Sequence, residues 1–134
     1  MVMLTEEAID RALLAHGDWK RRLAQAIDRD GEGLSIQVVK SDDLCEFGLW
    51  LYRDLDDSIK SLPIYERARQ LHAEFHREAG RVLAMAQSKH RFEAKDAIEP
   101  DSQFARLSGA LTLVLDKWRF RARKATQEFP TQPK

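Results

Sequence analysis

His72 and His76 stand four residues apart in a stretch with the periodicity of a helix. At that spacing two helical side chains differ by only about 40° in direction and about 6 Å in height, so both rings can face one point. Leu71, Phe75 and Ala79 share the apolar side of this stretch, which predicts that the imidazoles face the interior. Two buried imidazoles without a carboxylate between them need a shared partner, and zinc is the metal expected for neutral imidazole.

His16 and Cys45 are the other candidate ligands. His16 lies within the apolar stripe of the first predicted helix, and Cys45 lies in the first turn of the second, where partial positive charge favours a thiolate. Counted at about 1.5 Å per residue from the turn that joins the second and third helices, Cys45 lies about 18 Å and His72 about 15 Å down. His16 can reach this level if the connector after its helix climbs back about 18 Å. One thiolate and three imidazoles suit tetrahedral zinc, so the predicted metal ligands are His16, Cys45, His72 and His76.

Other metal centres fit the sequence less well. No histidine is preceded by the Glu-x-x-His pattern of di-iron bundles, and no Cys-x-x-Cys-His is present for attached haem. Ala73 stands where the His-Glu-x-x-His motif of zinc peptidases has its general base. Two alternatives stay open. The histidines can be ordinary core residues of a helical interaction module without a metal, or Cys45 can leave zinc to admit a water in an enzyme.

The elements that must position these residues are predicted to be four amphipathic helices. Together they predict an all-α fold, an antiparallel four-helix bundle with an extended connector between the first two helices. That connector, residues 34–40, contains the β-branched residues Ile36, Val38 and Val39. The helices are predicted over residues 5–28, from an N-cap among residues 41–43 to residue 57, over residues 63–86 and over residues 102–125. Residues 1–125 form the predicted domain, and residues 126–134, with two prolines, form a flexible tail.

Two glycines lie beside candidate ligands. Gly17 costs helix propensity, about 1 kcal/mol against alanine, and indicates close packing next to His16. Gly48 follows Cys45 by almost one turn and has no side chain to hold a neighbouring helix away.

Composition limits the partners and the location. The chain of 134 residues is long enough for one domain with a real core. Lys plus Arg and Asp plus Glu both count 22, and this zero net charge argues against nucleic acid or an anionic membrane as an obligatory partner. The single cysteine excludes an internal disulfide, and the sequence has neither a long apolar run nor a signal-peptide pattern. A soluble cytoplasmic protein is predicted.

Three segments together resemble the chemoreceptor zinc-binding (CZB) domain family. They are His16-Gly17-Asp18-Trp19-Lys20, Cys45-Glu46-Phe47-Gly48-Leu49-Trp50-Leu51 and His72-Ala73-Glu74-Phe75-His76, and the resemblance spans roughly residues 4–121. It implies a helical bundle with one zinc held by three histidines and a cysteine, which by position are His16, Cys45, His72 and His76. It also implies a regulatory role, commonly attached to chemoreceptors or diguanylate cyclases and often as a homodimer.

The predicted function is therefore sensory. No receptor signalling hairpin and no Gly-Gly-Asp-Glu-Phe cyclase motif is present, which indicates a stand-alone member or the regulatory piece of a longer protein. Four protein ligands would close the zinc sphere and disfavour hydrolytic catalysis, so the chain is not expected to be an enzyme. It is expected to pass zinc state, or the oxidation state of Cys45, to a signalling partner. The resemblance adds hypochlorite as an oxidant sensed in some chemoreceptors.

Overall fold

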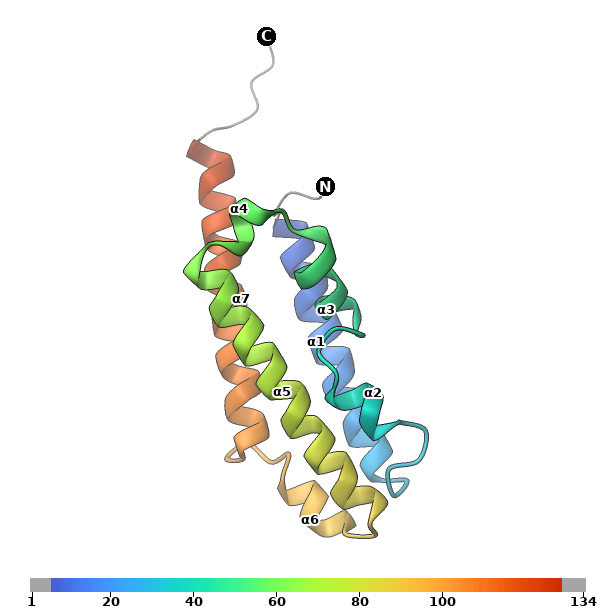
Figure 1. Cartoon of the computed structure of the whole chain (residues 1–134). Helices are drawn as coiled ribbons and strands as arrows, with labels where there is room; N and C mark the ends of the chain where they lie inside the picture. Colours follow the sequence, from blue (N-terminus) through green and yellow to red (C-terminus); the bar gives the residue numbers. More distant parts are fainter. Residues whose placement is uncertain (1–5, 129–134) are drawn as a thin grey trace.

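Three long helices dominate the computed structural model, which describes residues 6–128 (Figure 1). Helices α1 (Glu6–Ile27) and α5 (Pro63–Gln87) run in the same direction, and α7 (Gln103–Glu128) runs back alongside them. The described residues contain no β-strand, so the predicted all-α class is confirmed. The shorter elements are α2 (Ile36–Lys40), α3 (Glu46–Leu49), the π-helical turn η1 (Trp50–Asp54), α4 (Asp57–Lys60) and α6 (Arg91–Asp96).

The second predicted helix, which was expected to run from residues 41–43 to residue 57, is broken into short pieces. The chain returns as α2, which packs on α5, and then as α3, which packs on α1 and leads into η1 (Figure 1). Leu55 then takes an extended conformation before α4. Asp56 starts α4 because its carboxylate accepts a hydrogen bond from the Ile59 N–H over 3.1 Å. The prediction of one continuous helix to residue 57 was therefore wrong, because Asp56 caps the start of a new helix.

The connector over residues 34–40 was also predicted wrongly as extended. Ser35 caps α2 by accepting a hydrogen bond from the Val38 N–H, and Val39 is completely buried. A Cβ on Gly80 of α5 would lie 2.8 Å from the Cβ of Lys40, so this glycine lets α2 pack closely on α5. Tertiary contact thus outweighs the extended preference of the β-branched residues.

The core lies between the three long helices and under α2, α3 and η1. The apolar stripes predicted for the long helices are buried as expected. The largest fully buried apolar side chains are Ile9, Leu23, Ile27, Val39, Leu51, Phe75, Leu83, Leu111, Leu115 and Trp118.

The ends of the three long helices differ by only a few residues from the predicted ones. The backbone of α7 continues to Glu128, so the first part of the predicted tail is helical. Residues 129–134, the rest of the predicted tail, and residue 5, the start of the first predicted helix, lie outside the described residues.

Candidate metal centre

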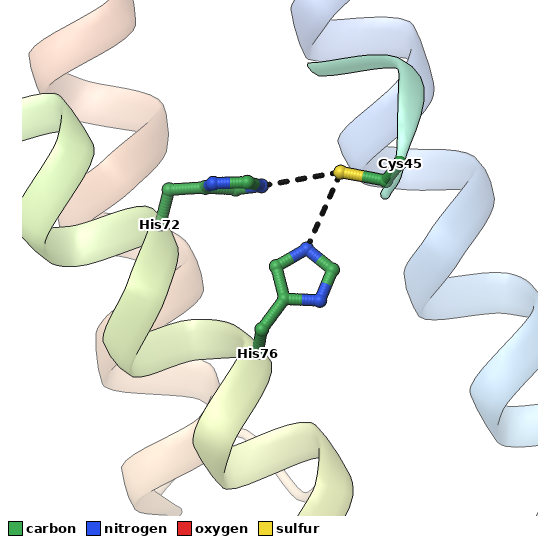
Figure 2. Close-up of side chains that lie close together, drawn as sticks. All are labelled: Cys45, His72 and His76. Carbon is green, nitrogen blue, oxygen red and sulfur yellow. Dashed lines mark hydrogen bonds between the residues drawn. The ribbon is translucent and has the colours of Figure 1, made fainter. Parts of the chain in front are cut away.

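Cys45, His72 and His76 meet in the core. The Cys45 Sγ atom lies 3.3 Å from His72 Nε2 and 3.4 Å from His76 Nε2, and all three donor atoms lie within 4.8 Å of one another. Figure 2 shows the sulfur pointing from its own segment across to the two rings on α5. The residues are 7, 1 and 1% exposed, so the donors face each other away from bulk water.

The spacing of these donors fits a zinc ion. Zinc binds sulfur at about 2.3 Å and imidazole nitrogen at about 2.0–2.1 Å, and tetrahedral angles then place sulfur and nitrogen about 3.5 Å apart. The two observed sulfur–nitrogen distances are within about 0.2 Å of that value. A thiolate and neutral imidazoles are also the donor types that zinc prefers.

A hydrogen bond fixes the protonation of the His76 ring. Nδ1 lies 2.6 Å from the Val39 carbonyl oxygen, which can only accept, so Nδ1 carries the proton and donates it. The lone pair of the neutral ring is therefore on Nε2, the atom that faces Cys45. The carbonyl belongs to the last turn of α2, where helix carbonyls lack partners within the helix. In metal sites generally, a carbonyl or carboxylate that accepts the proton of the non-ligating ring nitrogen orients the histidine.

The His72 ring is held by packing instead. Its Nδ1 atom is buried without a hydrogen-bond partner among the described residues. The Phe47 ring lies against it, with 4.5 Å between the ring centroids. Nε2 of His72 consequently points at the sulfur through steric confinement.

Burial keeps the imidazoles neutral. Desolvation lowers the pKa of His16 to about 4 and that of His72 to about 2, and it also lowers the pKa of His76. Nearby histidines add to the effect at His16 and His72. At neutral pH the rings can therefore offer lone pairs to a metal.

Cys45 departs from its predicted state. It is the N-cap of α3, one position before the first turn, and its sulfur accepts a hydrogen bond from the Gly48 N–H over 3.3 Å. The Gly48 and Phe47 amides lower the pKa of the thiol as predicted, but burial raises it by more. The prediction that Cys45 is a thiolate is therefore wrong for the side chain without a metal, because desolvation disfavours the charged form.

Gly48 is required for this local structure. A Cβ there would lie 1.9 Å from the Asp42 carbonyl oxygen, so only glycine lets the backbone at residue 42 fold over α3. The predicted close approach is present, although the neighbour is a turn and not a helix. The close packing predicted at Gly17 is wrong, since a Cβ there meets nothing within 4 Å.

His16 lies beside this group but is not part of it. The residue is buried on α1, and its ring packs at a tilt against the Phe75 ring, with 4.5 Å between the ring centroids. Its Nε2 atom lies 2.9 Å from the hydroxyl of Ser108 on α7. The structure thus brings together three of the four predicted ligands and gives the fourth a hydrogen-bond partner that the sequence analysis missed. Ser108 occupies a position in the apolar stripe of α7, and this polar residue among apolar ones was an available signal.

An open groove borders Cys45. It has a volume of about 800 Å³ and lies between α1 and residues 33–46, with Trp19, Leu44 and Cys45 among its lining residues. The groove therefore reaches the residue that carries the thiol. None of the described helices combines the length and the apolar character needed to cross a membrane.

Comparison with known families agrees with the site. The family model described as "Chemoreceptor zinc-binding domain" matches residues 16–83. The matched segment is shorter than the resemblance over residues 4–121, yet it contains all four predicted ligands, whereas Ser108 lies beyond it. No curated protein and no solved structure matches the chain.

Proposed function

The chain belongs to the chemoreceptor zinc-binding domain family, and we propose that it is a regulatory domain that binds one zinc ion. The proposed ligands are Cys45, His72 and His76, with His16 as the fourth. The single observation that carries the proposal is the separation of the Cys45 sulfur from two imidazole nitrogens by the sulfur–nitrogen distance of a zinc tetrahedron.

The residues divide the work of binding between them. His72 and His76 offer neutral nitrogens from α5, and Val39 keeps the His76 lone pair on the inner side of the ring. Cys45 contributes from the turn before α3, so binding would join this turn to α5. Bound zinc would supply the positive charge that keeps the thiol deprotonated in spite of its burial.

The segment that contains Cys45 is suited to carry a signal. α3 has four residues and η1 has five, so their order depends on contacts with the long helices more than on helix propensity. We propose that zinc occupancy, or oxidation of Cys45, changes the order of residues 42–54. A signalling protein of the chemotaxis or cyclic-di-GMP type would read this change in the cytoplasm, with the chain acting as a homodimer. No catalytic role is proposed.

Metal content tests the binding site. Purified protein should hold one zinc per chain by elemental analysis, and Cys45→Ala and His76→Ala should each lose most of it. His90→Ala, at a side chain that is 57% exposed, is the matched control and should keep the metal. Replacement by cobalt should give a sulfur-to-cobalt charge-transfer band that Cys45→Ala abolishes. Unchanged zinc content in both ligand variants would reject the site and leave a metal-free helical module.

Oxidation tests the signal. Hypochlorite converts a cysteine thiolate to a sulfenic acid while it is itself reduced to chloride, and the product is a poorer zinc ligand. Treated protein should release zinc and exchange amide hydrogens faster over residues 42–54 than over α5. A treated protein that keeps its zinc, its exchange pattern and an unmodified Cys45 would reject redox sensing and leave zinc itself as the signal.

A further inference from the structure

Ser108 is an exceptional residue in the core. Among the residues whose burial is described, 6–124, it is the only buried serine or threonine, and it is 3% exposed. It lies on α7 beyond the family match, between the apolar residues Phe104 and Leu111 of the same stripe. A hydroxyl in such a place is costly unless it is hydrogen-bonded, and its side-chain partner is His16 on α1.

The hydrogen bond holds His16 at a distance from the metal donors. His16 Nε2 lies 2.9 Å from Ser108 Oγ, and neither ring nitrogen belongs to the set of donors within 4.8 Å of one another. Ligand atoms around tetrahedral zinc lie only about 3.3–3.6 Å apart. The His16 ring must therefore move before it can complete the tetrahedron with Cys45, His72 and His76.

We propose that Ser108 is a positioning residue that competes with the metal for His16. While the ring is bonded to Ser108, the site offers three protein donors, and the fourth becomes available when that bond breaks. This inference rests on the proposed zinc-binding function and concerns the residue that sets its affinity. Once released, the Ser108 hydroxyl can bond to the Phe104 carbonyl one turn back, as buried helical serines do.

The competition links the metal to α7. The hydrogen bond between His16 and Ser108 is a polar contact between α1 and α7, joining residues 92 positions apart in the sequence. Metal binding that takes His16 would remove this contact from the interface of the two helices. α7 contributes no proposed ligand, yet its packing on α1 would then depend on the state of the site.

Zinc affinity in Ser108→Ala is the direct test. Removal of the hydroxyl abolishes a neutral hydrogen bond that stabilises the protein before metal binding, so the variant should bind zinc about two- to tenfold more tightly in competition with a chromophoric chelator. Ser108→Thr keeps a hydroxyl and should stay near the wild-type value. Thr112→Ala is the matched control, because Thr112 bonds to the Ser108 backbone carbonyl and not to His16.

A double-mutant cycle assigns the effect to His16. In a His16→Ala background the Ser108→Ala substitution should leave zinc affinity unchanged, because the imidazole for which Ser108 and zinc compete is absent. Histidine nitrogen NMR gives an independent measure: His16 ring signals should change in Ser108→Ala without metal and should move on zinc titration of the wild type. Circular dichroism checks that each variant keeps its helices.

The outcomes separate this inference from the proposed function. Weaker zinc binding in Ser108→Ala would mean that the hydroxyl supports a ligating His16, and unchanged binding would mean that the two residues are not linked to the metal. Either result overturns the competition while wild-type zinc binding stands. A wild-type protein that takes up no zinc would instead reject the function and the competition together.

Discussion

His76 donates its Nδ1 proton to the Val39 carbonyl oxygen over 2.6 Å, and this one bond joins a ring of the candidate metal centre to the last turn of α2. The same turn packs on α5 at Gly80, where a side chain would meet Lys40. The orientation of the ring and the packing of α2 are therefore one structural unit. A change that moves α2 away from α5 would also break this hydrogen bond, and Nδ1 of His76 would no longer be held in its protonated form.

Acid should destabilise the protein when zinc is removed by a chelator. His16 and His72 have pKa values of about 4 and about 2 in the folded chain, below the unfolded value of 6.5. The unfolded chain therefore binds more protons below pH 6.5, so this stability is full above pH 6.5 and decreases as the pH falls. At pH 5.5 the two residues together should cost about 3 kcal/mol relative to pH 7.5. Urea unfolding at both values measures it.

A variant assigns this pH dependence to its source. His16→Asn removes one of the two titrating rings and should reduce the loss by about half. Equal stability of the wild type at pH 7.5 and 5.5 would contradict the neutral, buried state of these histidines.

Zinc should stabilise the fold by an amount set by its concentration. At a free concentration of about 1,000 times the dissociation constant the gain is about 4 kcal/mol, or roughly 10–20 °C in Tm for a domain of this size. Thermal unfolding with buffered zinc and with excess chelator measures the difference. Cys45→Ala should show little of the gain, and an equal gain in that variant would place the metal elsewhere.

Gly48→Ala should damage the site and the fold together. The new Cβ would lie 1.9 Å from the Asp42 carbonyl oxygen and 2.9 Å from the carbonyl carbon, so backbone must shift. We expect a loss of about 1–3 kcal/mol in unfolding free energy, as for other overpacked sites, and weaker zinc binding because Cys45 moves with the turn.

Gly109→Ala is the control for this substitution. Gly109 lies exposed on α7, and a Cβ there meets nothing within 4 Å. Its replacement should raise stability by about 0.5–1 kcal/mol through helix propensity and leave zinc affinity unchanged. Similar effects at the two glycines would show that the contact with Asp42 is unimportant.

Tyr52→Phe should make Cys45 more reactive. The Tyr52 hydroxyl of η1 donates a hydrogen bond to the Asp42 carboxylate, and burial together with that carboxylate raises the pKa of Tyr52 to about 12. Loss of the bond should cost about 1–2 kcal/mol and loosen the turn that leads to Cys45. The rate of thiol alkylation without zinc should therefore increase.

Tyr65→Phe provides the comparison for thiol reactivity. The Tyr65 hydroxyl donates to the Leu51 carbonyl over 3.1 Å, so its loss also costs stability. Its hydroxyl donates its hydrogen bond to η1 and not to Asp42, so the alkylation rate should stay close to the wild-type rate. Equal acceleration in both variants would indicate general loosening and not a specific role of Tyr52.

The long helices and the histidine pair were predictable because their signals are local. Four-residue spacing on one helix places His72 and His76 side by side wherever that helix packs. α2 was not predictable, since the burial of Val39 and the closeness of Gly80 are tertiary facts that outweigh the local preference of β-branched residues. Counting the rise per residue along the helices could place His16 at the level of Cys45 and His72. It could not identify Ser108, 92 residues away, as the partner of His16.

The groove beside Cys45 brings solvent to one edge of the candidate site. The sulfur is only slightly exposed, and the opening lies between α1 and residues 33–46, with Leu14 and Val38 among its walls. Arg11, Asp18 and Arg22 also line this groove. We expect zinc and small oxidants to approach Cys45 from this face of the molecule, and not through the buried surroundings of His72 and His76.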